Sequence, residues 1–149
     1  MAGRFGLALA MSVIACGLAA GPAAALRVWM QEGDIRKDLV GQQLSGIYPN
    51  GLEWTEQIRT DGTSDYREGG RSHPGRWTLK GELFCFSYPA PTMGGCFRVV
   101  RRGVNCYELY TASYGGTVPA QPPPASEMSW NGRMWSDAAR PTCEEKEIS

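Results

Sequence analysis

Residues 77–111 read WTLKGELFCFSYPAPTMGGCFRVVRRGVNCYELYT and carry the clearest structural pattern in the chain. Three runs in this stretch, 82–88, 95–100 and 105–111, alternate aromatic or aliphatic residues with polar residues or cysteines. Such alternation, broken by Gly- and Pro-containing turns, is typical of antiparallel strands with one buried face. The side chains assigned to the buried face are Trp77, Leu79, Phe84, Phe86, Tyr88, Phe97, Val99, Tyr107 and Leu109. The outer face carries Cys85, Ser87, Cys96, Arg98, Cys106 and Glu108.

Turn signals extend this pattern towards the N-terminus. Asn50-Gly51 favours a type I′ hairpin turn, because both residues accept positive φ, and centring the turn there places Ile47 opposite Trp54. Asp61-Gly62 predicts a second turn. These signals divide the region before residue 69 into short strands.

A Gly-rich loop over 69–75 and a tight turn at Lys80-Gly81 follow, and the latter turn pairs Trp77 with Phe84. The turns recur about every 8–12 residues, a spacing typical of an all-β meander, sandwich or small barrel. Helical crossovers have no room, so a parallel sheet is excluded.

We therefore predict an all-β fold, an antiparallel meander of six or seven strands forming a small closed or half-closed, lipocalin-like barrel. The strands occupy about residues 42–111 of a single domain over 26–116. A short helix over 34–40 precedes them, with Asp34 as its N-cap and Gly41 ending it. The predicted core comprises Trp54, Trp77, Phe84, Phe86, Phe97, Val99, Tyr107 and Leu109.

The N-terminal segment predicts export. Arg4, an apolar run and the small residues Ala23-Ala24-Ala25 give residues 1–25 the layout of a secretory signal peptide. Val13-Ile14-Ala15-Cys16 also resembles a lipobox, in which Cys16 would be lipidated. We favour cleavage after Ala25 and a location in the periplasm; the alternative is a lipid anchor through Cys16. The apolar stretch is short for a transmembrane helix, and no later segment is apolar enough to span a membrane.

The four remaining cysteines predict two disulfides. An even number of cysteines in a small exported domain is typical of structural disulfides, and a zinc site would need closely spaced Cys or Cys/His pairs. The predicted register places Cys96 beside both Cys85 and Cys106. We favour Cys85–Cys96 with Cys106–Cys143, and Cys96–Cys106 with Cys85–Cys143 is the alternative.

Residues 117–128 form a Pro-rich linker, because Pro119 and 122–124 cannot enter the interior of a sheet. Residues 129–149 form a C-terminal tail with Trp130, Trp135 and Cys143. We expect this tail to dock over the outer face of the sheet, held by a disulfide.

Charge argues against a nucleic-acid partner. The chain has 15 Lys and Arg against 15 Asp and Glu, whereas binding to phosphates needs a basic face. The small cluster of Arg98, Arg101 and Arg102 is interpreted as a solvated strand end and turn rather than an anion site.

A histidine-based catalytic site has little support. His73 and Ser72 are adjacent in an expected exposed loop, where neighbours in sequence rarely meet as base and nucleophile, and no orienting acid or oxyanion hole is evident. No hydrolase, metalloprotease or phosphate-binding motif occurs. We predict no catalytic, cofactor or metal site, and a protein that is not an enzyme.

Paired carboxylates offer a second catalytic possibility. Glu53 with Glu56, or Asp61 with Asp65, could serve glycoside hydrolysis, but surface hairpins commonly carry such residues. The tryptophans could line a cavity for one apolar ligand, although a filled core is the simpler interpretation.

The run from Trp54 to Tyr110 resembles a known group of sequences. The resemblance rests on Asp61-Gly62, YREGG (66–70), PGRW (74–77), FCF (84–86), GCFRVV (95–100) and, in the tail, TCEEK (142–146). The run resembles small periplasmic proteins of alphaproteobacteria grouped as a domain-of-unknown-function family. The resemblance implies the periplasm, a β fold and a four-cysteine framework, and no known activity. Periplasmic protease inhibitors with a small lipocalin-like barrel are similar in architecture alone.

The expected function is that of an exported, non-catalytic module that binds an envelope protein or a small apolar ligand. The alternative is an envelope hydrolase or a periplasmic enzyme inhibitor. A cavity of a few hundred Å³ would favour the small ligand, and a filled core with an exposed aromatic patch would favour the protein partner.

Overall fold

The computed structural model describes residues 28–112, 122 and 129–143. The predicted signal peptide (1–25) with Cys16, the Pro-rich linker (117–128) except Pro122, and residues 144–149 of the predicted tail lie outside the described residues.

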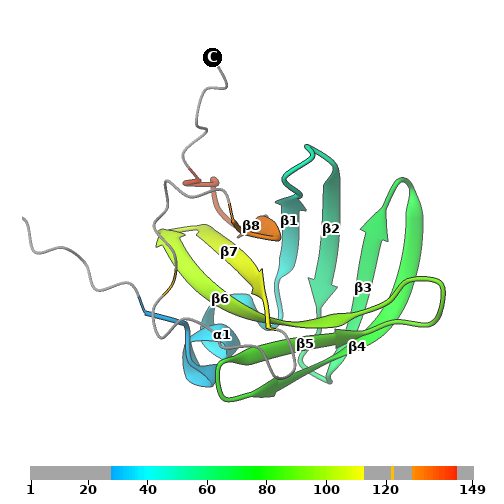
Figure 1. Cartoon of the computed structure of the whole chain (residues 1–149), viewed down its shortest axis with the longest axis horizontal. Coiled ribbons are helices and arrows are strands. Elements are labelled where there is room, and N and C mark those ends of the chain that lie inside the picture. The colour runs from blue at the N-terminus through cyan, green and yellow to red at the C-terminus, as the bar shows by residue number, and fades with distance from the viewer. Residues whose placement is uncertain (1–27, 113–121, 123–128, 144–149) are drawn as a thin grey trace, which may run out of the picture.

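The chain folds as a closed antiparallel barrel in which each strand pairs with the next along the sequence (Figure 1). The last strand pairs with both its predecessor and the first strand, so the sheet has no free edge. The elements are α1 (Glu32–Leu39), β1 (Gln43–Ile47), β2 (Glu53–Ile58), β3 (Thr63–Glu68), β4 (Arg71–Lys80), β5 (Leu83–Ser87), β6 (Gly95–Gly103), β7 (Cys106–Thr111) and β8 (Gly132–Ser136).

The barrel has eight strands, so the prediction of six or seven was wrong. The additional strand is β8, which comes from the tail and lies between β7 and β1 rather than over the outer face, whereas Trp130, just before β8, packs on the outer face. Met134 faces inward from β8 and is buried. Asn105 fixes the end of the strand, because its side-chain amide donates to the Ser136 carbonyl at 2.9 Å and its oxygen accepts from the Ser136 N–H at 2.8 Å.

The first hairpin differs from the predicted register by one residue. Trp54 lies opposite Gly46, and Ile47 lies opposite Glu53. The connection has three central residues rather than two, because Pro49 is suited to the start of a type I turn and Gly51 follows with φ +83°. Gly46 leaves room for the indole, since a Cβ at this position would come within 2.2 Å of the Trp54 ring.

Two predictions for the hairpins between β3 and β5 were also wrong. The loop expected over 69–75 is only a Gly69-Gly70 turn, with φ of +55° and +77°, because β4 begins at Arg71. Trp77 pairs with Phe86 rather than with Phe84. This shift of two residues leaves every side chain on its predicted face.

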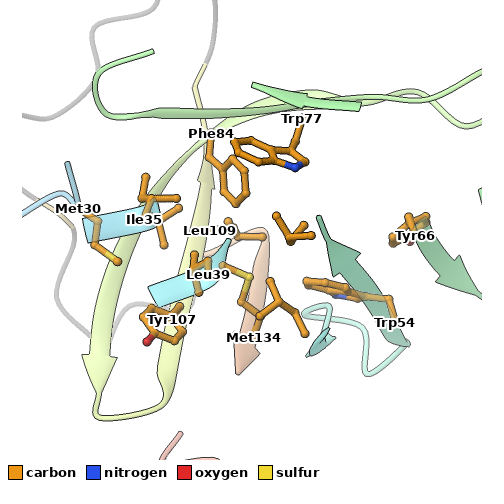
Figure 2. Close-up of a cluster of buried hydrophobic side chains, with 13 residues drawn as sticks. Met30, Ile35, Leu39, Trp54, Tyr66, Trp77, Phe84, Tyr107, Leu109 and Met134 are labelled. Atoms are coloured by element: carbon orange, nitrogen blue, oxygen red, sulfur yellow. The ribbon is translucent and has the colours of Figure 1, made fainter. Parts of the chain in front are cut away.

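Helix α1 closes one end of the barrel, which we call the closed end. Ile35 and Leu39 are fully buried, and Figure 2 shows them reaching from α1 into the cluster that contains Phe84 and Met134. The helix begins two residues before the predicted Asp34 cap. Gln31 is the N-cap, and Asp34 is instead the third helical residue that accepts the Gln31 N–H, as in a capping box.

The predicted core is largely correct. Six of its eight residues are buried: Trp54, Trp77, Phe84, Val99, Tyr107 and Leu109. The other two, Phe86 and Phe97, are half-buried and pack against this cluster. They lie towards the end of the barrel opposite α1, which we call the open end.

The outer face of β6 and β7 is covered rather than solvated. Trp29 and Trp130 pack with Val100 and Tyr110 into a second buried cluster. Beneath them Glu108 is 0% exposed and forms ion pairs with Arg102 at 2.6 Å and Arg133 at 2.8 Å. The outward residues of β7 are therefore also core residues.

The disulfides join Cys85 to Cys96 and Cys106 to Cys143. Cys96 is the cross-strand neighbour of Cys85, as expected, but it is not beside Cys106. Strand β6 continues to Gly103, which pairs with Cys106, so the turn lies at 104–105 rather than directly after the predicted run 95–100. The second disulfide fixes the chain just beyond β8.

Candidate ligand-binding cavity

The open end of the barrel contains a cavity of about 280 Å³. Its walls are largely aromatic, because the inward positions near this end of five strands or their adjoining turns carry large rings. These residues are Tyr48, Trp54, Tyr66, Phe86, Tyr88 and Phe97. Figure 2 shows Trp54 and Tyr66 on the side of the cluster away from the helical residues Ile35 and Leu39.

The rim of the cavity is formed in part by the connection between β5 and β6. Thr92, Met93 and Gly94 line the cavity, and Met93 is 87% exposed. The Thr92 hydroxyl lies 2.9 Å from Nδ1 of His73, which connects this loop to β4. A Cβ on Gly94 would come within 1.8 Å of the Phe86 carbonyl oxygen, so only glycine allows the loop to lie this close to β5.

Glu56 places a carboxylate on the cavity wall. Alternation along β2 turns Trp54, Glu56 and Ile58 inward, and Glu56 is only 5% exposed. Tyr88 donates a hydrogen bond to its Oε1. Burial raises the pKa of Glu56 to about 7, because the charged form loses hydration, and the hydroxyl of Tyr88 offsets only part of that effect.

Glu68 is the second carboxylate on the wall. Tyr66 donates to its Oε2 at 2.9 Å, and the hydroxyls of Tyr66 and Tyr48 are 2.8 Å apart. Burial raises the pKa of Tyr48, and the negative charges of Glu68 and Glu56 raise it further. The charges of both carboxylates therefore raise the pKa of the same hydroxyl, that of Tyr48, at the open end.

One buried polar group at the cavity lacks a partner. The indole N–H of Trp54 has no hydrogen-bond partner in the described part of the chain, although the residue is only 5% exposed. By contrast, the indole of Trp77, near the closed end, donates to the Arg59 carbonyl at 2.8 Å. A buried donor without a partner is costly, and a bound ligand or water would satisfy it.

The structure does not bring Ser72 and His73 together as a catalytic pair. Ser72 donates to Asp65 on the outer side of β3, whereas His73 is half-buried beside the Tyr66 ring, with ring centroids 5.9 Å apart. Successive residues of a strand point to opposite faces, and both residues belong to β4.

The two acid pairs considered from sequence are also separated. Glu53 is exposed while Glu56 points into the barrel, since residues three apart on a strand face opposite sides. Asp61 accepts from the N–H of Thr63 at 2.9 Å in a turn, and Asp65 forms an ion pair with Arg67 at 2.9 Å. Residues 28–112 and 129–143 contain no group of three or more His, Cys, Asp or Glu arranged to hold a metal ion.

Sequence reasoning assigned Tyr88 to the buried face, but it missed Tyr48, Tyr66 and Glu68 and treated Glu56 as a surface residue. The alternation of Trp54, Glu56 and Ile58 could have placed Glu56 inside. The tryptophans divide between different environments: Trp54 lines the cavity and Trp77 fills the core, while Trp29 and Trp130 cover the outer face.

Comparison of the chain with protein-family models, with curated proteins and with solved structures gave no match. The resemblance to the alphaproteobacterial family therefore stays a prediction. In the part of the chain that the structure describes, no helix combines the length and apolar character needed to cross a membrane.

Proposed function

We propose that this protein is an exported, non-catalytic binding module that holds a compact small molecule in the open end of its barrel. The observation that carries the proposal is the aromatic cavity of about 280 Å³ with a buried carboxylate on its wall. Mostly apolar walls with a few placed polar groups are typical of small-molecule sites.

The volume limits the ligand to a small size. A cavity of about 280 Å³ equals the volume of about nine waters in the liquid, at about 30 Å³ each. It lies just below the range of about 300–1,000 Å³ typical of drug-sized ligands. A single ring with a short side chain fits this limit, and the flat faces of Tyr66, Phe86 and Tyr88 suit a planar apolar body.

Unfavourable burial also supports a binding role. Ionised Glu56 inside the barrel reduces the stability of the fold, and the Trp54 N–H has no hydrogen-bond partner among the residues that the structure describes. An apolar side chain at position 56 would avoid the first cost. Groups that oppose stability tend to collect at functional sites, because function rather than folding retains them.

The disulfides fit an oxidising, extracytoplasmic compartment. We place the protein in the periplasm on the basis of the signal-peptide pattern in residues 1–25. In that location, a disulfide-bonded barrel with one open end would serve as a carrier or sensor of a small molecule in the bacterial envelope.

Saturation-transfer NMR tests the proposal with three probes of matched shape: phenethylamine, 2-phenylethanol and phenylacetate. At least one should bind the wild-type protein. Leu109→Trp places a large ring in the cavity and should abolish that binding, whereas Thr78→Trp, on the exposed surface of β4, should preserve it. Circular dichroism checks that both variants fold. Absence of binding by all three probes, or equal binding by the two folded variants, would contradict the proposal.

A further inference from the structure

We infer that the cavity selects a small organic ammonium ion, whose charged group lies between Glu56 and Glu68 and whose apolar body lies against the aromatic walls. This inference rests on the proposed function, because it names the class of ligand that the same cavity would take.

The charges on the cavity wall favour a cation. Two of the lining residues are acidic, and none is Lys or Arg. Neither Glu56 nor Glu68 takes part in an ion pair among the described residues. Arg67, next to Glu68 on β3, forms an ion pair with Asp65 on the outer face, and Arg71, opposite Glu68 on β4, is exposed and does not line the cavity. A cationic ligand would supply the missing positive charge.

Hydrogen bonding at the two carboxylates leaves capacity for a donor. A carboxylate has about four lone-pair sites, and an ammonium group has three N–H donors. Tyr88 occupies one site on Glu56, and Tyr66 occupies one on Glu68. The tyrosines hold the acids in place without neutralising them, so an ammonium N–H can bond to the remaining sites.

The aromatic rings favour the same class of ligand. The Tyr66 centroid lies 5.5 Å from that of Tyr88 and 6.3 Å from that of Trp54, and Tyr48 lies 6.0 Å from Trp54. These tilted rings form a continuous wall. Their electron-rich faces attract ammonium groups, and their area shields the apolar part of the ligand from water.

The other ligand charges fit less well. A carboxylate ligand would face two acidic side chains and the hydroxyl of Tyr48, which both acids already influence. A neutral alcohol would gain the aromatic contacts without the charge attraction. The geometry therefore predicts the order amine, then alcohol, then carboxylate for ligands of equal shape.

Isothermal titration at pH 8 with phenethylamine, 2-phenylethanol and phenylacetate tests this order. At pH 8 Glu56 is mostly ionised, since its pKa is about 7, and an aliphatic amine is protonated. We expect phenethylamine to bind at least about tenfold more tightly than the alcohol. Glu56→Gln and Glu68→Gln should each weaken amine binding about tenfold and change alcohol binding less than about twofold.

Glu53→Gln is the matched control, because Glu53 lies on the same strand but is exposed outside the barrel. It should leave the affinity for all three probes unchanged. Equal affinity for amine and alcohol, or equal loss of both in the Glu56 and Glu68 variants, would overturn the inference and leave the proposed function intact. Failure of all three probes to bind would overturn both.

Discussion

Replacing Glu56 by Gln should make the protein more stable at neutral and alkaline pH. The side chain is 5% exposed, and its pKa rises from 4.5 to about 7 because burial penalises the charge. One pKa unit corresponds to about 1.36 kcal/mol, so ionised Glu56 lowers the free energy of unfolding by about 3 kcal/mol at pH 8. Glutamine has nearly the same shape and cannot ionise.

The pH dependence follows from the direction of the shift. Below pH 4.5 Glu56 is protonated in both folded and unfolded chains and contributes no difference. Between pH 4.5 and about 7 the unfolded chain loses the proton first, so stability falls as pH rises, and the loss is complete above pH 7. The other groups that act on the pKa of Glu56 are Tyr88, Ser64 and Asp65. They are present in both proteins, so their effects largely cancel in the difference.

Urea unfolding followed by tryptophan fluorescence at pH 4, 6 and 8 measures this difference. Glu56→Gln and wild type should agree within about 1 kcal/mol at pH 4, and the variant should gain up to about 3 kcal/mol at pH 8. Glu53→Gln should follow the wild type at every pH. A difference that does not change with pH, or a variant that is less stable at pH 8, would refute the assignment of Glu56 as a destabilising buried charge.

Three further variants test the rest of the structure by urea unfolding at pH 7. Glu108→Gln should lose about 3–5 kcal/mol, because it leaves the buried positive charges at the outer cluster without their carboxylate. Loss of the Cys106–Cys143 disulfide by double Ser substitution should cost about 4 kcal/mol, from the separation of 37 residues that it closes. Gly46→Ala should destabilise the protein by at least about 1 kcal/mol, since its Cβ would come within 2.2 Å of the Trp54 ring. If any of these three variants is as stable as the wild type, the contact that it removes or disturbs does not stabilise the fold.

The alternating pattern in residues 77–111 was enough to predict the strands and their inward faces. An error of an even number of residues in a hairpin register, such as the shift of two at Trp77, left each side chain on its predicted face of the sheet. In the hairpin at Asn50-Gly51 the register shifted by one residue. That odd number reversed the faces and turned Ile47 outward. Pro49 is the local reason, because it selects a longer connection than the type I′ turn.

Strand β8 was not predictable from its own pattern. Residues 132–136 contain Met134 and Trp135 but no run of alternating apolar residues, and a Pro-rich segment precedes them. Their position depends on contacts distant in sequence, chiefly Asn105 and the pairing with β1 and β7. Closure of the barrel is therefore a tertiary effect, as is the open cavity, which results from how the large rings pack at one end.

The most direct test of ligand binding in the cavity is the indole N–H signal of Trp54 in a ¹H–¹⁵N correlation spectrum, assigned with Trp54→Phe. During titration with phenethylamine this signal should move progressively to saturation, because Trp54 lines the cavity and its N–H has no hydrogen-bond partner in the described part of the chain. The signals of Trp77, bonded to Arg59, and of Trp130, on the outer face, should stay in place. A Trp54 signal that remains fixed at saturating phenethylamine, 2-phenylethanol and phenylacetate would contradict the existence of a ligand site in the barrel.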